Sequence, residues 1–147
     1  MHNDKKVILL VEDNPDDERL TLRALKKNNF LNDIVIARDG EEALDYLLGT
    51  GSYAGRDMKI MPSLILLDIK LPKIDGLEVL NQIRSNPLTK GLAVVILTSS
   101  KEEQDLQTSY NLNVNSYIRK PVDFSHFVQV IKQIGFYWLV LNETPSA

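Results

Sequence analysis

The sequence predicts an α/β domain built around a parallel β-sheet. Two observations lead to this prediction: five short apolar segments alternate with segments of helical periodicity, and three of the five are continuous runs of Val, Ile and Leu. Such runs are typical of parallel strands that helices cover on both faces. The chain has 147 residues, 44% hydrophobic and 25% charged, a size and composition that suit one globular domain.

The expected strands are the apolar segments that lie between turn and helix signals. They are residues 7–11, 33–37, 63–68, 92–98 and 115–120. Because strands and helices alternate along the chain, and because crossovers between parallel strands are right-handed, few arrangements of the sheet remain.

The expected helices begin at residues that cap helix N-termini well, which are Asn14, Asp39, Asp75, Ser100 and Asp123. Pro15 suits the first helical position, and Gly49 would end the second helix after Leu48. The third and fourth caps are each followed three residues later by a glutamate, which is the spacing of a capping box.

The composition limits the function classes. The net charge of −3 gives no electrostatic reason to expect a nucleic-acid partner. The chain has no cysteine, which excludes disulfides, thiolate chemistry and cysteine-ligated zinc. The apolar run at residues 7–11 is too short for a signal peptide or a membrane span, so we expect a cytoplasmic protein with no membrane partner.

Polar side chains follow four of the expected strands at the point where each strand ends. Glu12 and Asp13 follow the first strand, Asp68 ends the third, Thr98 ends the fourth and Lys120 ends the fifth. Parallel α/β sheets bind ligands beyond the carboxyl ends of their strands. We therefore expect these side chains to meet at one edge of the sheet.

These residue types suit phosphoryl transfer. Three carboxylates in one pocket repel one another, and a hard divalent cation such as Mg²⁺ lets them stay ionised together. Lys120 would add a compact positive charge, Thr98 a hydroxyl donor, and an aspartate can act as a nucleophile. Each residue by itself also has an ordinary interpretation, as a helix-cap acid, a core threonine or a surface lysine. Agreement at four strand ends favours the functional interpretation.

The chain resembles the receiver domain of two-component response regulators over residues 6 to 134. The motifs that carry the resemblance are "LLVEDN" (9–14), "LILLDIKLPKIDG" (64–76), "VVILTSS" (94–100) and "SYIRKP" (116–121). The resemblance implies a flavodoxin-like, CheY-like fold, a doubly wound parallel sheet of five strands in the order 2-1-3-4-5.

The resemblance also implies roles for the strand-end residues. Asp68 corresponds to the phosphoacceptor, which takes a phosphoryl group from a phosphohistidine on a sensor histidine kinase. Asp13, Asp68 and the main-chain carbonyl of Lys70 correspond to the Mg²⁺ ligands, and Glu12 to the second acid of the site. Lys120 corresponds to the lysine that pairs with the phosphoacceptor and then with the phosphoryl group.

Three further expectations come from the same resemblance. Thr98 and Tyr117 correspond to a switch pair, whose hydroxyl turns toward the phosphoryl group while the ring swings inward. The switch would alter the surface formed by the fourth helix, the fifth strand and the last helix. The Lys120–Pro121 peptide bond corresponds to one that is usually cis. The chain would be no enzyme beyond catalysing its own phosphorylation and dephosphorylation.

Three features narrow the resemblance to single-domain regulators that partner cyanobacterial phytochromes. They are the long connection at residues 49–62, the "LPKIDG" stretch at residues 71–76 and the aromatic segment at residues 136–139. The kinase would then be regulated by light. We expect the receiver to occupy residues 1–134, followed by an extension, 135–147, that begins apolar and ends polar.

The apolar part of the extension has two possible uses. It can fold back on its own domain, or it can form a symmetric homodimer with the neighbouring helix and strand face. The residues in question are Phe136, Tyr137, Trp138 and Leu139.

Two rival functions were weighed against the receiver. An aspartate-nucleophile phosphatase of the haloacid dehalogenase type requires a second aspartate two residues after the nucleophile, where this chain has Lys70. A receiver-like binding module that is not phosphorylated usually lacks an acid, the acceptor or the lysine, and this chain has all of them.

Overall fold

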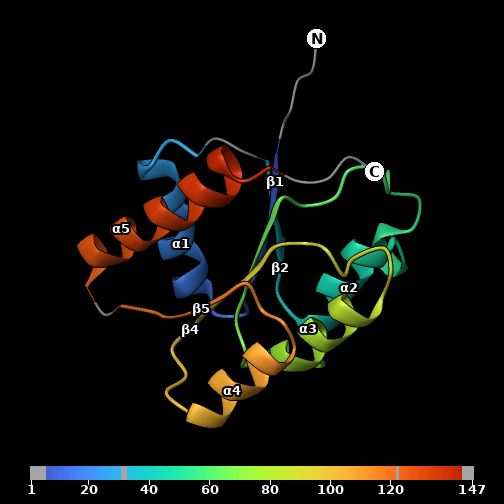
Figure 1. The fold of residues 1–147 in the computed structure, drawn as a ribbon. Coiled ribbons are helices and arrows are strands. Elements are labelled where there is room, and N and C mark those ends of the chain that lie inside the picture. The colour runs from blue at the N-terminus through green and yellow to red at the C-terminus, as the bar shows by residue number, and fades with distance from the viewer. Residues whose placement is uncertain (1–5, 31–32, 122, 144–147) are drawn as a thin grey trace.

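A computed structural model describes residues 6–30, 33–121 and 123–143. Its core is a parallel sheet in the order β2-β1-β3-β4-β5, which confirms the predicted fold class and strand order (Figure 1). The strands are β1 (Val7–Val11), β2 (Asp33–Ala37), β3 (Leu64–Leu67), β4 (Val94–Thr98) and β5 (Ser116–Arg119). Three strands are one or two residues shorter at one or both ends than the sequence predicts, because backbone pairing sets the strand ends and the residue pattern locates them only to within one or two residues.

Helices cover both faces of the sheet (Figure 1). They are α1 (Pro15–Lys27), α2 (Gly40–Leu48), α3 (Gly76–Ser85), α4 (Glu103–Asn111) and α5 (Phe124–Gly135). Alternate residues of β1 divide the core, since Ile8 and Leu10 pack with α1 and α5 while Leu9 and Val11 pack with α2 and α3. The sheet is therefore buried on both sides, as its continuous apolar strands require.

Most predicted helix caps are observed. The side chain of Asn14 accepts hydrogen bonds from the amides of Asp16 and Asp17, and Asp39 accepts one from the amide of Glu42. Asp75 caps α3 in the same way. Gly49 ends α2 in the left-handed conformation, with φ of 67°.

The predicted cap at Ser100 is wrong. The residue before α4 is Glu102, and the helix begins at Glu103. The hydroxyl of Ser100 donates instead to Oδ2 of the buried Asp105, at 2.7 Å. A buried carboxylate needs a donor more than the exposed helix end needs an acceptor, because water can satisfy the latter.

The long connection between α2 and β3 is organised by Arg56. Its guanidinium donates to the carbonyl of Tyr46 at 2.7 Å and lies 4.1 Å above the Tyr46 ring. A short 3₁₀ turn, η1 (Gly51–Tyr53), lies in the same segment. The connection enters the amino end of β3, which is the end opposite Asp68.

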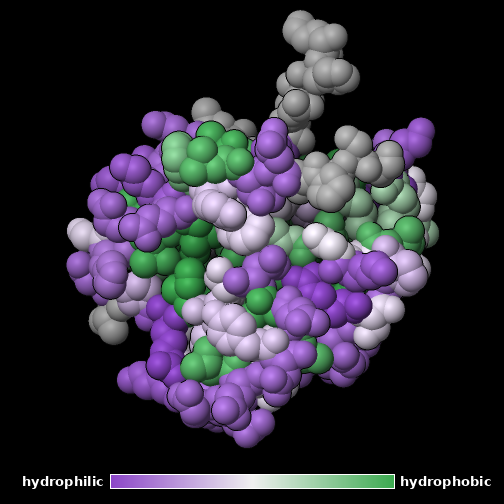
Figure 2. All heavy atoms as spheres, viewed as in Figure 1, coloured by the Kyte–Doolittle hydropathy of each residue, from purple (hydrophilic) through white to green (hydrophobic). Residues whose placement is uncertain are grey.

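The chain continues from α5 into a π-helical segment, η2 (Phe136–Leu141). Leu139 is buried, Trp138 packs against the core beneath α1 and α5, and the Lys6 ammonium donates to the Leu139 carbonyl at 2.6 Å. Phe136, Tyr137, Val140 and Leu141 stay about half exposed, and apolar atoms gather at the end of this segment in Figure 2. The helices of the described residues are all too short or too polar to cross a membrane.

Candidate functional site

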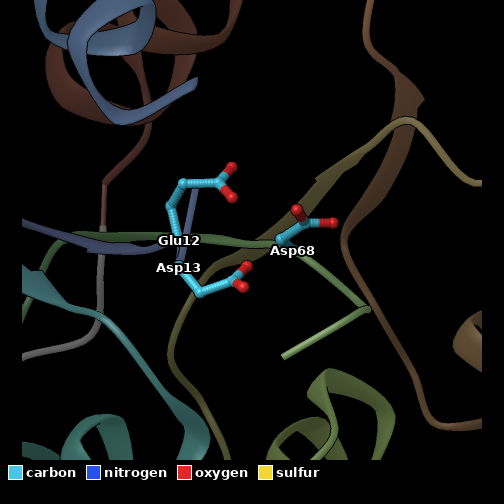
Figure 3. A group of neighbouring side chains, drawn as sticks. All are labelled: Glu12, Asp13 and Asp68. Carbon is cyan, nitrogen blue, oxygen red and sulfur yellow. The ribbon is translucent and has the colours of Figure 1, made fainter. Parts of the chain in front are cut away.

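The register of the sheet brings the predicted acids together. Val11 pairs with Leu67, and the amide of Asp68 donates to the Val11 carbonyl at 3.1 Å. Glu12, Asp13 and Asp68 therefore leave neighbouring strands at the same edge. Figure 3 shows the three side chains side by side, and one carboxylate oxygen of each lies within 4.8 Å of the others.

This cluster has the donor set that suits a small divalent cation. It offers oxygen ligands only, which is the preference of Mg²⁺, and Asp13 is exposed while the other two acids are buried. A bound Mg²⁺ would keep some of its water on the open side. Three carboxylates this close repel one another, and a cation relieves that repulsion.

Lys120 lies on the other side of the phosphoacceptor candidate. Its amide donates to the Thr98 carbonyl at 2.8 Å, which fixes the chain just after β5. Its ammonium Nζ lies 2.6 Å from Glu12 Oε1, 3.2 Å from Asp17 Oδ2 and 3.4 Å from Asp68 Oδ2. The lysine therefore balances three carboxylates, one of which the sequence did not single out.

Burial dominates the electrostatics of the pair formed by Glu12 and Lys120. Burial raises the pKa of Glu12 to about 7, although the hydrogen bond and charge of Lys120 oppose the rise. Burial by itself would lower the pKa of Lys120, but the negative charges of Asp68 and Glu12 outweigh it and raise that pKa. Lys120 therefore stays positively charged, while Glu12 is the group of this pair that gains or loses a proton near neutral pH.

Comparison with known proteins now decides the family. The family model described as "Response regulator receiver domain" matches residues 8–132. This chain belongs to that family. The match favours neither the phosphatase nor the unphosphorylated binding module, and receivers are in general regulators, not metabolic enzymes.

Three relatives illustrate the similarity. The probable methanogenesis regulatory protein FilR2 of Methanothrix harundinacea is 42% identical, over 97% of this chain and 90% of that protein. The response regulator Rcp1 of Synechocystis sp. is 41% identical over 99% and 97% of the two chains. The phosphorylated cyanobacterial phytochrome response regulator RcpA superposes with a TM-score of 0.87 at 45% identity, over 96% and 99% of the two chains. Rcp1 has also been solved in an Mn²⁺-bound form, with a TM-score of 0.86 at 40% identity over 96% and 99%.

The two residues predicted to form a switch pair, Thr98 and Tyr117, lie on β4 and β5. Thr98 is fully buried, and its hydroxyl accepts a hydrogen bond from the amide of Ser100 at 3.2 Å. Tyr117 lies on β5 with its hydroxyl buried, and that hydroxyl makes no hydrogen bond within the described residues. Ser100 lies nearby, but its own hydroxyl is bonded to Asp105. Burial raises the pKa of Tyr117, so its phenol stays neutral.

Two predictions for the receiver need comment. The side chain of Lys70 is exposed, 3.8 Å from Asp105, and the proposed metal contact of its carbonyl stays a prediction. The expectation of a cis Lys120–Pro121 bond is wrong, since the described residues contain no cis peptide bond. The trans form before proline is favoured by only about 0.5–1 kcal/mol, so a sequence motif cannot fix the isomer.

Sequence reasoning missed two acids at the site. Asp17 looked like an ordinary first-turn acid of a helix, and only its contact with Lys120 distinguishes it from Asp16. Asp105 looked like a surface residue of α4, yet it is buried and bonded to Ser100. A polar residue on the inward face of a helix is the one signal that could have indicated either.

Proposed function

We propose that this receiver is a phosphorylation-dependent switch, which takes a phosphoryl group from a sensor histidine kinase onto Asp68. The observation that carries the proposal is the position of the Asp68 carboxylate, which belongs to the acidic cluster and lies 3.4 Å from the ammonium of Lys120. An anion formed at this point would have the positive charge of Lys120 beside it, and a Mg²⁺ ion held by the cluster would add a second.

The chemistry follows from these groups. A carboxylate oxygen of Asp68 attacks the phosphorus of the phosphohistidine, an O–P bond forms, and the electron pair of the breaking P–N bond returns to the imidazole. Lys120 donates to the phosphoryl oxygens as the phosphoryl group moves onto Asp68. Mg²⁺, when held by Glu12, Asp13, Asp68 and the carbonyl of Lys70, supplies further neutralisation of phosphoryl charge. Attack by water on the acyl phosphate restores the carboxylate and releases phosphate.

The response is a rearrangement of Thr98 and Tyr117. The added phosphoryl group carries a charge of about −1.5 to −2 at pH 7. It draws the Thr98 hydroxyl away from the Ser100 amide, and the Tyr117 ring moves toward the space that is vacated. This movement changes the surface formed by α4, β5 and α5.

The test is an intact-mass measurement after incubation with acetyl phosphate, with and without Mg²⁺. We expect a Mg²⁺-dependent gain of one phosphoryl group that the Asp68→Asn variant lacks. Asp16→Asn is the matched control, because Asp16 is an exposed acid paired only with Arg19 among the described residues. Equal labelling of Asp68→Asn and wild type would overturn the assignment of the phosphoacceptor.

We further propose that the kinase is a phytochrome. The support is the similarity over nearly the whole chain to RcpA, a cyanobacterial phytochrome response regulator by its description. Phosphotransfer from the histidine kinases of the source organism tests this. Faster transfer from the phytochrome kinase than from the others is expected, and an equal or slower rate would contradict it.

The last part of the proposal concerns assembly. We treat residues 1–134 as the receiver and 135–147 as an extension, of which 144–147 lie outside the described residues. Trp138 and Leu139 pack on their own domain, which leaves Phe136 and Tyr137, each about half exposed, as contacts of a symmetric homodimer formed with the α4–β5 face. Sedimentation of both phosphorylation states should show dimers that Tyr137→Ser weakens. Leu88→Ser, at an exposed site elsewhere, is the control.

A further inference from the structure

We propose that Asp17 is a positioning residue, which competes with Asp68 for the Lys120 ammonium and draws it toward α1 until the phosphoryl group arrives. This inference deepens the proposed function and rests on it. Its starting point is the set of three carboxylates around Nζ, in which Asp17 Oδ2 lies at 3.2 Å and Asp68 Oδ2 lies further away, at 3.4 Å.

Each proton of the Lys120 ammonium has a carboxylate acceptor in this arrangement. It has three protons and three carboxylate acceptors, and its side chain is only 10% exposed, so water contributes little. Any movement of the lysine toward a phosphoryl group on Asp68 must weaken one of the other two contacts. The position of the lysine is therefore a competition among its acceptors.

Asp17 differs from the other two acceptors in where it lies. Glu12 and Asp68 belong to the acidic cluster, whereas the group of potential metal ligands among the described residues does not include Asp17. Asp17 is on α1, its side chain is 34% exposed, and it lines a pocket beside Lys120 and Phe124. It can therefore attract the Lys120 ammonium without also coordinating a metal ion.

The backbone of Asp17 is held firmly. Its amide donates to the Asn14 side chain at 3.1 Å in the first turn of α1. A carboxylate at this end of a helix also interacts favourably with the helix dipole. The acceptor is thus a fixed point, and the flexible partner is the lysine.

Asp17 would therefore affect Lys120 differently before and after phosphorylation. Before phosphorylation, Asp17 shares the Lys120 ammonium with Glu12 and Asp68, which lessens its compensation of the cluster's negative charge and leaves the cluster more attractive to a cation. After phosphorylation, the doubly charged phosphoryl group outcompetes the single charge of Asp17, and the lysine moves to it. Removing the Asp17 charge should release the lysine toward Glu12 and Asp68 in advance.

Two measurements test this, each with Asp16→Asn as the control. Asp16 precedes Asp17 in the same helix turn and carries the same charge, but its side chain is 78% exposed and bound to Arg19. By calorimetry, Asp17→Asn should weaken Mg²⁺ binding about threefold more than Asp16→Asn does. At saturating Mg²⁺, it should speed phosphorylation by acetyl phosphate by about the same factor.

A double-mutant cycle shows whether the effect passes through the lysine. In a Lys120→Met background, Asp17→Asn and Asp16→Asn should change Mg²⁺ affinity equally. If that background does not fold, Asp17→Glu serves instead and should restore wild-type affinity and rate. The proposal would be overturned if Asp17→Asn and Asp16→Asn weakened Mg²⁺ binding equally in the wild-type background. It would also be overturned if Asp17→Asn still weakened Mg²⁺ binding more than Asp16→Asn did in the Lys120→Met background. If acetyl phosphate does not label the wild-type protein, the proposed function is overturned instead. The Mg²⁺ affinities of the variants would still test whether Asp17 positions Lys120.

Discussion

The ammonium of Lys120 lies 2.6 Å from a carboxylate oxygen of Glu12, and yet the pKa of Glu12 is raised to about 7. A cation at this distance normally lowers the pKa of an acid. Here burial costs the carboxylate more than the lysine returns, and the neighbouring negative charge of Asp68 raises the pKa further. The site therefore contains an acid that titrates near neutral pH.

This relationship predicts a pH-dependent affinity for Mg²⁺. Below pH 7 Glu12 holds a proton that cation binding must displace, so affinity should rise as pH rises. For one group with a pKa of about 7, the rise between pH 6 and pH 8 is about tenfold. Calorimetry across this range measures it. Glu12→Gln, which cannot ionise, should give a nearly flat profile, and a wild-type profile equally flat would contradict the assignment.

The hydrogen bond between Thr98 and Ser100 predicts how the switch fails. Thr98→Ala removes the hydroxyl that a phosphoryl group would attract. The loss of its hydrogen bond to the Ser100 amide at this buried position should lower the unfolding free energy of the protein by about 1 kcal/mol. Phosphorylation should still occur, but the shift of the Tyr117 ring resonances in NMR spectra should be lost. Thr98→Ser keeps the hydroxyl and should keep the shift. A full shift in Thr98→Ala would show that the two residues are uncoupled.

Gly76 controls the geometry of the loop after Asp68. A Cβ at Gly76 would lie 2.1 Å from the carbonyl oxygen of Asp68 and 2.8 Å from Cα of Ile69. Gly76→Ala should therefore displace this loop, cost about 2–3 kcal/mol in unfolding free energy, and slow phosphorylation. Gly91→Ala, where a Cβ meets no atom within 4 Å, is the control and should change neither quantity. Urea unfolding and intact-mass time courses measure both.

Arg84 holds the end of the sheet opposite the site. Its guanidinium donates to the carbonyls of Asn113 and Leu92 at 2.9 and 2.8 Å and to the Asn115 side chain at 2.8 Å. Arg84→Ala removes all of these hydrogen bonds and should cost about 3 kcal/mol in urea unfolding. Arg19→Ala removes only a surface pair with Asp16 and should cost less than about 1 kcal/mol. Similar losses for the two variants would contradict this role.

Much of the candidate site could be predicted because it depends on where strands end. The run before Asp68 and the run before Glu12 are buried strands of a parallel sheet, and Val11 pairs with Leu67. Once the sheet order is known, the acids after these strands must be neighbours. The same logic places Thr98 and Lys120, whose strands pair with each other up to Thr98 and Arg119.

The remaining details could not be predicted because they depend on side chains of helices and loops. Helical spacing puts Asp17 on the same face of α1 as the buried Thr21, but only the packing of α1 brings its carboxylate to Lys120. The capping-box spacing at Ser100 was outweighed by a buried acceptor on Asp105. The isomer of the Lys120–Pro121 bond rests on an energy difference too small for a motif to fix.

The sequence by itself thus determined the α/β class, the caps of α1, α2 and α3, and the residues that gather at one edge of the sheet. Periodicity and strand order act through the backbone, which obeys rules that any chain of this pattern follows. Only the tertiary structure decided how Lys120 is shared, that Glu12 titrates near pH 7, and that Trp138 and Leu139 pack inward while Phe136 and Tyr137 stay exposed. These properties depend on burial and on distances of a few ångströms between residues far apart in the chain, where small displacements change the electrostatic energy most.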